Sequence, residues 1–441
     1  GLDYMETYAP TSRYSTLRIF LTLAVQLSLV LIQMDIKTAF LYGVLEEEIY
    51  LQPPLGVSVP AGKVLLLRKS LYGLKQAPRV WNENIHNTLT KLGGVNSLYD
   101  ECLYVFKTEN ALALLNLFVD DILLAFKGVS LCDKIVNALK SMYEIVEMGT
   151  PKFCLGMGFG LTKSGLYLNQ TAAIEKFLRR FDFHDCKPSQ LPMCTKFVPK
   201  VRDEKTEPLC TKPYRSAVGC LLYLSQCTRP DIAQAVGVLA RYSDFPDERH
   251  WDGIKKVLKY LQGTKDYCLV FDRQPNNDHS IIGYSDSSWG DDLTTRKSSF
   301  GYLFKFYGNT ITWAAKLEPI VTVSPCESEY LALSEACKEA MWIRHLLSAI
   351  GLAETVPTPI RVRGDNEGSI NIAESSSFHS RTKHIDIRHH YIKELVRNDL
   401  ISLEWIPTEQ MAADCFTKPL PFPRFSQFVP KLNLKRAKEI I

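Results

Sequence analysis

A pair of adjacent aspartates interrupts a long apolar stretch and limits how the surrounding chain can fold. Residues 111–119 are almost entirely apolar, Asp120 and Asp121 follow, and residues 122–125 resume the apolar pattern. Short apolar runs bounded by polar residues are typical of buried strands. The pattern therefore predicts a hairpin that carries two carboxylates at its tip.

A third aspartate ends a second apolar run. Residues 15–27 have the pattern of a buried helix, and residues 29–34 form a short apolar run that ends at Asp35. If the two predicted strands are neighbours, three carboxylates converge at one sheet edge, and their mutual repulsion favours a divalent cation such as Mg²⁺. The alternative interpretation is that Asp35 only ends a strand and that Asp120-Asp121 only forms a turn.

The pattern changes after residue 280, where apolar periodicity predicts an α/β domain. The predicted strands cover 281–285, 300–306, 310–314, 360–363 and 400–405, with a long helix over 328–350 and a final helix after Pro407. Carboxylates are spread along these elements. Asp286 ends the first strand and Glu329 lies near the start of the long helix, while Asp365 ends the fourth strand and Asp414 lies inside the final helix.

Composition excludes several other classes of protein. The net charge is +4, and the segment from residue 421 supplies as much positive excess, so bulk charge gives no sign of nucleic-acid binding. The 12 cysteines have no zinc-site spacing and are expected to be reduced thiols in an intracellular protein. The apolar segment 17–32 is shorter than the roughly 20 residues that a membrane span needs, so we predict a buried helix leading into a strand.

The middle of the chain connects these two regions. Residues 188–213 are rich in Pro, Lys and Thr, which predicts a linker or an extended crossing. Residues 215–261 have a helical pattern in two pieces that are split near Phe245.

Long, ordered motifs resemble the reverse transcriptase and RNase H region of copia-type LTR retrotransposon Pol polyproteins. In the first half these are residues 33–41 (QMDIKTAFL), 46–50 (EEEIY), 69–79 (KSLYGLKQAPR) and 118–121 (FVDD). The middle contributes residues 214–219 (YRSAVG), 228–232 (TRPDI) and 250–251 (HW). The last part contributes residues 284–289 (YSDSSW), 296–302 (RKSSFGY), 326–333 (CESEYLAL) and 383–388 (KHIDIR).

The resemblance implies a fold of mixed α+β and α/β class. It consists of a right-hand polymerase with palm, partial fingers and thumb-connection, followed by an RNase H-like domain. The expected boundaries are 1–148 for the partial fingers and palm, 149–278 for the thumb/connection, 279–420 for the RNase H-like domain and 421–441 for a basic C-terminal tail.

The resemblance also assigns roles in the polymerase. Asp35, Asp120 and Asp121 are the expected catalytic metal ligands, and Phe40 is the aromatic residue that favours deoxyribose. Tyr72, Gly73 and Lys75 are expected to lie at the incoming nucleotide. A basic cluster with no acidic residue among its members suits contact with phosphates, although a solvated loop face is the alternative; its members are Arg68, Lys69, Lys75 and Arg79.

In the RNase H-like domain the resemblance assigns metal binding and catalysis to Asp286, Glu329, Asp365 and Asp414. RNase H-type nucleases use an Asp, Glu, Asp, Asp order to bind two Mg²⁺ ions around a scissile phosphate. Two glutamates compete for one position, and we choose Glu329 because it directly precedes the apolar stretch 330–333, whereas Glu327 suits a helix N-terminus. Lys383 and Arg388 are expected to contact nucleic acid, and the histidines between 384 and 390 are not predicted to be metal ligands or catalysts.

The expected function is RNA-directed and DNA-directed DNA synthesis coupled to degradation of RNA in RNA/DNA hybrids, for retrotransposon replication. It implies two Mg²⁺ ions in each active site, with Mn²⁺ as a substitute. The implied partners are an RNA template, a DNA primer, the hybrid, dNTPs, other Pol segments such as integrase and protease, and a second copy of the chain. A cytoplasmic virus-like particle is the expected location, with the nucleus as a second.

An alternative follows from the position of Gly1 relative to the family. The chain starts after the basic strand pair of the fingers that grips the triphosphate in this family. The alternative function is therefore a catalytically impaired retroelement fragment that retains only nuclease or nucleic-acid-binding activity.

Overall fold

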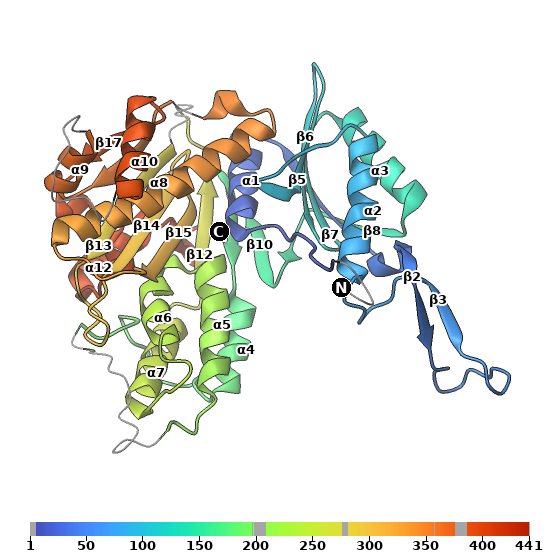
Figure 1. The fold of residues 1–441 in the computed structure, drawn as a ribbon, viewed down its shortest axis with the longest axis horizontal. Coiled ribbons are helices and arrows are strands. Elements are labelled where there is room, and N and C mark those ends of the chain that lie inside the picture. Colours follow the sequence, from blue (N-terminus) through green and yellow to red (C-terminus); the bar gives the residue numbers. More distant parts are fainter. Residues whose placement is uncertain are drawn as a thin grey trace. The chain divides into compact units, whose positions relative to one another are not determined.

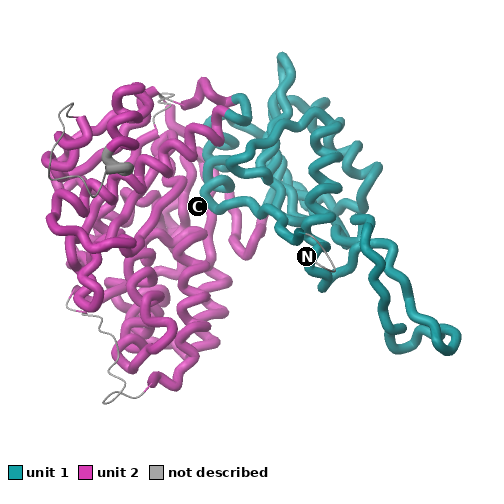
Figure 2. The backbone as a smooth tube through the Cα atoms, viewed as in Figure 1, with its two compact units in different colours: residues 1–151, 349–351 teal, residues 152–348, 352–441 magenta. Residues whose placement is uncertain are grey.

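The chain divides into two compact units, which Figure 2 shows in different colours. The computed structural model describes residues 6–195, 197, 209–275, 281–356, 358–374 and 386–440, and for residues 386–389 it describes the backbone only. Unit 1 comprises residues 1–151 with 349–351, and unit 2 comprises residues 152–348 with 352–441. The predicted thumb/connection and RNase H-like segments fall within unit 2, apart from residues 149–151 and 349–351, which belong to unit 1.

Unit 1 is built on a sheet with the strand order β4-β5-β6-β7-β1-β8. The predicted hairpin is present, because β6 pairs antiparallel with β7, and β7 also pairs antiparallel with β1. The elements are α1 (Tyr14–Gln26), β1 (Val30–Ile36), η1 (Ala39–Tyr42), β2 (Val44–Leu51), β3 (Leu65–Lys69), α2 (Ala77–Lys91), β4 (Val95–Ser97), β5 (Asp100–Lys107), β6 (Leu112–Phe118), β7 (Asp121–Lys127), α3 (Val129–Met142) and β8 (Ile145–Gly149) (Figure 1).

Helices cover the sheet of unit 1. Apolar side chains of α2 and α3, such as Trp81 and Leu139, pack in one cluster with Leu115 and Leu124 of the sheet. Helix α1 packs against β6, and its Thr16 hydroxyl donates a hydrogen bond to Asp100 of β5. The prediction of a buried helix followed by a strand is thus confirmed for the apolar segment 17–32. No helix among the described residues is long and apolar enough to cross a membrane.

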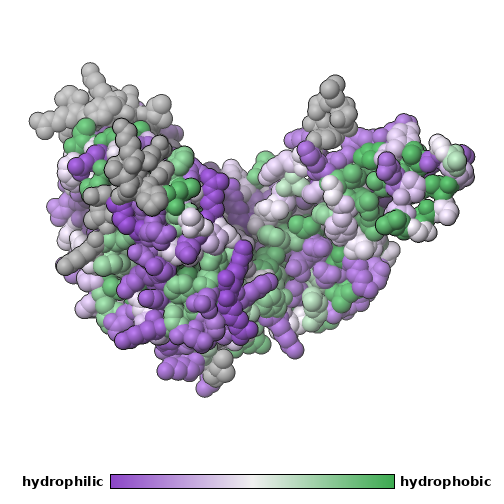
Figure 3. All heavy atoms as spheres, turned by 90° about the horizontal axis from the view of Figure 1, so that it is seen from below, coloured by the Kyte–Doolittle hydropathy of each residue, from purple (hydrophilic) through white to green (hydrophobic). Residues whose placement is uncertain are grey.

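The paired strands β2 and β3 form a separate ribbon with much exposed apolar surface. Residues of β2 alternate between exposed and half-buried, and no stretch of that strand is fully buried. Val44, Tyr50, Val64 and Leu66 are exposed, and apolar residues gather on this hairpin in Figure 3.

Unit 2 contains two sheets, with the strand orders β18-β12-β11-β10-β9 and β15-β14-β13-β16-β17. Its first part contains β9 (Phe153–Cys154), β10 (Met157–Leu161), β11 (Gly165–Asn169), α4 (Thr171–Arg180), α5 (Tyr214–Cys227), η2 (Pro230–Ile232), α6 (Ala233–Ala240), α7 (Glu248–Gly263) and β12 (Tyr267–Asp272). Its second part contains β13 (Ile281–Ser288), β14 (Ser299–Phe306), β15 (Asn309–Leu317), α8 (Pro325–Ala349), η3 (Ala353–Thr355), β16 (Ile360–Gly364), α9 (Glu367–Glu374), α10 (Asp386–Arg397), β17 (Ile401–Trp405), η5 (Thr408–Gln410), α11 (Asp414–Thr417), α12 (Phe422–Lys431), β18 (Leu434–Arg436) and η6 (Ala437–Glu439).

The strands predicted after residue 280 are all present, in a mixed sheet. Strand β13 pairs antiparallel with β14 and parallel with β16, so it lies at the centre. The loop residue Asp292 forms an ion pair with Arg241, which follows α6, at 3.2 Å. Arg241 also donates to the hydroxyl of Ser299, and these contacts join the helical part of unit 2 to the mixed sheet.

The predicted break near Phe245 is present between α6 and α7, but the number of helical pieces was wrong, because the chain also leaves the helix after Cys227. Pro230 cannot continue an α-helix, and Arg229 turns inward at this break. Arg229 is fully buried and forms an ion pair with Asp231 at 2.7 Å, while it also donates to the carbonyl of Thr264. A buried charge of this kind requires such partners.

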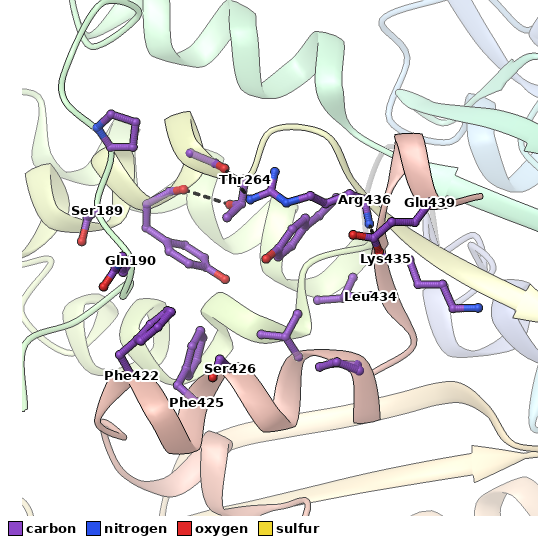
Figure 4. A pocket seen from close by; sticks show the side chains of 16 residues that line it. Ser189, Gln190, Thr264, Phe422, Phe425, Ser426, Leu434, Lys435, Arg436 and Glu439 are labelled. Atoms are coloured by element: carbon purple, nitrogen blue, oxygen red, sulfur yellow. Dashed lines mark hydrogen bonds between the residues drawn. The ribbon is translucent and has the colours of Figure 1, made fainter. Parts of the chain in front are cut away.

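The segment from residue 421 is folded into unit 2. Strand β18 extends the sheet by pairing with β12, and α12 packs beside it. This segment helps to line a cavity of about 430 Å³. Figure 4 shows Phe422 and Phe425 of α12 on one side of it and Thr264, at the end of α7, on the other. Arg436 of β18 closes one side, and its guanidinium donates to Asp266 at 2.6 Å.

Candidate active sites

Two of the predicted polymerase aspartates face each other across neighbouring strands of unit 1. Asp35 of β1 is the register partner of Asp121 of β7. Asp120 immediately precedes β7, and its backbone carbonyl accepts a hydrogen bond from the amide of Ile36 at 3.0 Å. The structure thus brings together Asp35, Asp120 and Asp121 at one sheet end, which we call the palm triad. The amide side chain of Gln33 donates to Asp121 at 3.1 Å.

The palm triad has the electrostatics of a site that would accept a cation. Burial raises the pKa of Asp35, and the charge of Asp120 raises it further. Burial also raises the pKa of Asp121, with Asp35 and Asp120 adding to the effect and the Gln33 hydrogen bond opposing it. Because the ionised forms repel each other, a divalent cation with oxygen ligands would stabilise them. The three residues therefore offer the kind of oxygen ligand that Mg²⁺ prefers, but their carboxylate oxygens do not all lie within 4.8 Å of one another in this structure.

The turn that carries Asp120 and Asp121 is held by a tryptophan that sequence reasoning missed. Val119 has a left-handed backbone with a φ of 60°, which is strained for a β-branched residue. Its carbonyl accepts a hydrogen bond of 2.7 Å from the indole Nε1 of Trp81, a buried residue of α2. The spacing of Trp81, Ile85 and Leu89 indicates an inward helix face, but nothing in the sequence indicates which carbonyl the indole meets.

The predicted nucleotide-contacting aromatics lie beside the palm triad. The rings of Phe40 and Tyr72 are 4.7 Å apart between centroids. The pKa of Tyr72 is raised by burial and then by the charges of Asp120 and Asp35, which places its hydroxyl within their field. Gly73 has a φ of 101°, a conformation that favours glycine, and a Cβ added there would meet open space.

Three members of the predicted basic cluster are exposed, and the fourth forms ion pairs with acidic side chains. Arg68 and Lys69, at the end of β3, and Lys75, in the following loop, are exposed. Arg79 forms ion pairs with Glu6 at 2.8 Å and with Glu83 at 2.9 Å, so its charge is largely compensated. The role of these four residues in nucleic-acid contact remains a prediction.

In unit 2 three of the four predicted nuclease carboxylates converge. Asp286 of β13, Glu329 of α8 and Asp365, which follows β16, each place one carboxylate oxygen within 4.8 Å of the others. We call these residues the nuclease cluster. Asp286 is buried, whereas the other two are half-buried. Such an all-oxygen set suits a hard divalent cation such as Mg²⁺.

The fourth carboxylate, Asp414, is held by basic side chains instead. The prediction that it lies inside the final helix was wrong, because it begins the four-residue α11 and another helix, α12, follows. Lys418 contacts Asp414 at 2.6 Å and Asp286 at 3.8 Å. Arg424 of α12 also forms an ion pair with Asp414. A cation from the predicted tail thus reaches the edge of the nuclease cluster.

Two threonines fix the orientation of the nuclease carboxylates. The hydroxyl of Thr417 donates to Asp286, and the hydroxyl of Thr408 donates to Asp365 at 2.7 Å. Arg424 also donates to the carbonyl of Thr408 at 3.0 Å, so α12 supports both Asp414 and the Thr408 loop. Sequence reasoning missed Thr408, Lys418 and Arg424, because their partners are fixed only by the path of the chain.

The structure separates the two competing glutamates of α8. Glu329 belongs to the nuclease cluster. Glu327 instead accepts a hydrogen bond of 2.7 Å from the backbone amide of Val323, and its own amide donates to the Ser324 hydroxyl. Glu327 therefore stabilises the start of the helix.

Burial makes the nuclease cluster costly to ionise without a cation. Burial raises the pKa of Asp286 to about 7, while the charge of Lys418 opposes this shift and the charge of Asp414 adds to it. Burial likewise raises the pKa of Glu329 well above its ordinary value, and Asp286 and Asp365 add to this. Protons or metal ions thus compete for the same oxygens.

A prediction on stability follows from these raised pKa values. The carboxyl of Asp286 stays protonated in the folded state up to about pH 7, whereas in the unfolded state it loses its proton near the ordinary pKa of 3.8. The contribution of Asp286 to stability is therefore complete below about pH 3.8 and is lost as the pH rises towards about 7. The increase in melting temperature caused by Mg²⁺ should therefore grow between about pH 5.5 and about pH 8, as the carboxyls ionise. Thermal unfolding with Mg²⁺ or EDTA measures this. An Asp286→Asn variant should show a weaker pH dependence, because Glu329 remains as a group with a raised pKa. An equal Mg²⁺ effect on the unchanged chain at both pH values would contradict the prediction.

Two predicted nucleic-acid contacts are not tested by the structure. Lys383 lies outside the described residues, and Arg388 lies in α10 where the side chains of residues 386–389 are not described. Both remain predictions.

The chain is similar to known proteins in both sequence and fold. Residues 1–195 match the family model "Reverse transcriptase (RNA-dependent DNA polymerase)". The chain is 38% identical over 436 residues to a retrovirus-related Pol polyprotein from transposon TNT 1-94 of Nicotiana tabacum, covering 96% of this chain and 32% of the relative. It is 31% identical to a putative transposon Ty5-1 protein of Saccharomyces cerevisiae, covering 69% of this chain and 100% of the relative.

The fold has a solved counterpart. A foamy viral protease-reverse transcriptase in complex with dsDNA matches with a TM-score of 0.50 at 12% identity, covering 86% of this chain and 68% of the other. The chain spans about a third of the length of the Pol polyproteins that it matches. With the family model on the first half and relatives that align along nearly the whole chain, this protein belongs to the reverse transcriptase family of copia-type retrotransposon Pol polyproteins.

Proposed function

We propose that this chain is an RNA-directed and DNA-directed DNA polymerase that also degrades the RNA of RNA/DNA hybrids during retrotransposon replication. The observation that carries the proposal is the presence of two carboxylate sites, one per unit, in a chain of this family. The palm triad lies on paired strands of unit 1, and the nuclease cluster joins residues that are far apart in the sequence of unit 2.

Each group of residues has a distinct part in the proposed chemistry. When bound at carboxylates such as these, Mg²⁺ activates an attacking hydroxyl or water and stabilises the departing oxygen. In unit 1 the palm triad would hold two such ions, with Mn²⁺ as a substitute, while Phe40 and Tyr72 border the sugar and base of the incoming nucleotide. In unit 2 Asp286, Glu329 and Asp365 would hold the ions, and Lys418, which contacts both Asp414 and Asp286, links the fourth carboxylate to them.

The proposed partners follow from the proposed reactions. They are an RNA template, a DNA primer, their hybrid and dNTPs, with other Pol segments such as integrase and protease in the full polyprotein. A relative of known structure was solved with dsDNA, which supports a duplex as a ligand. A cytoplasmic virus-like particle, with access to the nucleus, is the proposed location.

A paired assay on the whole chain tests the proposal. A labelled DNA primer annealed to an RNA template is incubated with dNTPs and Mg²⁺, and primer extension and RNA cleavage are read from the same reaction. Both activities are expected, and both should stop with EDTA. Cleavage without extension would favour the impaired-fragment alternative, and loss of both would reject the enzymatic proposal.

Trp81 provides a prediction specific to the palm. Trp81→Phe keeps an aromatic ring in the core but removes the indole hydrogen bond to Val119, so the strained turn loses a net contribution of about 1 kcal/mol and the palm triad is less well positioned. Primer extension should fall roughly tenfold or more through kcat, because misplacement of the reacting groups by a fraction of an ångström is costly.

Two measurements distinguish this effect from general damage. RNA cleavage by the same variant should stay within about twofold of the unchanged chain, since the nuclease cluster lies in unit 2. Trp251→Phe, which changes a mostly buried tryptophan of α7 in unit 2, is the matched control and should leave extension unaltered. Normal extension by Trp81→Phe would show that the hydrogen bond does not position the turn.

A further inference from the structure

A second cavity of unit 2, of about 370 Å³, lies beside the nuclease cluster but contains none of its residues. Its lining includes Tyr284, Lys305, Arg363, Ile406, Gln410 and Lys431. Tyr284 lies two residues before Asp286 on β13, so both side chains point to the same face of the sheet. Lys431 ends α12, the helix whose Arg424 binds Asp414.

Several basic side chains line this cavity, and they differ in how far neighbouring acidic groups compensate their charges. Arg363 donates to Glu404 and to the Tyr284 hydroxyl, both at 3.0 Å. Glu404 is shared with Arg361 at 3.6 Å. The ammonium of Lys431 contacts the backbone carbonyl of Glu409 at 3.4 Å and lies 4.8 Å from the centroid of the Phe428 ring, and neither group carries a full negative charge.

Of these residues, Lys305 gives the clearest indication that the cavity attracts an anion. It lies on β14 opposite Ile282 and is half-buried. Burial lowers its pKa to about 8, and the charge that lowers it further is the neighbouring cation Lys431. Two ammonium groups that face one partly enclosed space repel each other, and a bound anion would remove that repulsion.

We propose that this cavity binds a phosphate group, with Lys305 and Lys431 supplying the opposite charge. A tetrahedral oxyanion offers enough acceptor oxygens for both ammonium groups, for the Tyr284 hydroxyl and for the Gln410 amide at once. The phosphate comes either from the backbone of a bound nucleic-acid strand or from free phosphate. The binding does not depend on either proposed catalytic activity.

Chemical labelling of lysines tests the proposal on the whole chain. At about pH 8 roughly half of Lys305 is neutral and open to acetylation, and a bound anion raises its pKa and slows the reaction. Inorganic phosphate should slow the acetylation of Lys305 by about threefold or more relative to chloride at equal ionic strength, as read by mass spectrometry. Lys316 on β15, which is exposed, is the internal control and should react at the same rate in both salts.

A substitution gives an independent measurement. Lys305→Met keeps the apolar stem and removes the charge, so the affinity for inorganic phosphate in calorimetric titration should fall roughly tenfold, whereas Lys316→Met should bind as the unchanged chain does. Circular dichroism checks that both variants fold.

The source of the phosphate is distinguished by competition. If a short DNA duplex also slows Lys305 acetylation and the effect is weaker in Lys431→Met, the ligand is a backbone phosphate. If inorganic phosphate protects Lys305 and the duplex does not, the ligand is free phosphate. Acetylation of Lys305 that neither compound slows, with equal phosphate affinity of the Lys305→Met and Lys316→Met variants, would overturn the proposal.

Discussion

Primer extension should fall about a thousandfold or more in Asp35→Asn, while RNA cleavage in the same preparation stays near its original rate. The substitution removes a carboxylate from the palm triad, so cations bind less tightly there and the attacking hydroxyl is misplaced. The nuclease cluster lies in the other unit and keeps all its ligands.

The thermal stability of the Asp35→Asn variant should not fall along with its activity. The pKa of Asp35 is raised by burial and by Asp120, so the ionised side chain is unfavourable in the folded chain without a cation. A neutral asparagine relieves this repulsion, and the melting temperature in EDTA at about pH 8 should be unchanged or higher. Asp133→Asn, at an exposed position of α3, is the matched control and should alter neither activity. Equal loss of extension and cleavage in a folded Asp35→Asn variant would contradict the separation of the two sites.

Hybrid-dependent RNA cleavage should be lost, by about a thousandfold or more, in Glu329→Gln. Glu329 places an oxygen within 4.8 Å of Asp286 and Asp365, and the amide supplies a neutral and weaker ligand in its place. Primer extension by the same variant should be retained, because the palm triad is unaffected.

The neighbouring glutamate, Glu327, provides a matched control for this prediction. Glu327→Gln changes the same chemical group two residues away on α8, but its carboxylate accepts from the Val323 amide at the helix start. RNA cleavage by this variant should stay within about threefold of the rate of the unchanged chain. Its melting temperature should fall slightly, because the start of the helix is weakened. Cleavage that is lost in Glu327→Gln and kept in Glu329→Gln would show that the glutamate assignment is reversed.

The local structure around the sites was largely predictable from the sequence. The apolar runs before Asp35 and Asp120 predicted strands, and the pairing of β1 with β7 brings their ends together as expected. The strands after residue 280 were also predicted, because alternation and apolar runs reflect which faces of an element are buried. The break at Thr228-Arg-Pro was missed, since the helical periodicity of residues 215–261 continues on both sides of it.

The amino-acid sequence by itself determined which carboxylates this protein presents and, except for Asp414, on which elements they lie, because short-range periodicity and strand ends are local properties of the chain. Only the tertiary structure decided their partners. Trp81 reaches the carbonyl of Val119, and Arg424 in a segment predicted as a tail reaches Asp414. Lys305 and Lys431, far apart in the chain, line one cavity. The physical reason is that a hydrogen bond or ion pair requires two groups within a few ångströms, and for residues distant in sequence that proximity is set by how packed elements cross, which no local pattern encodes.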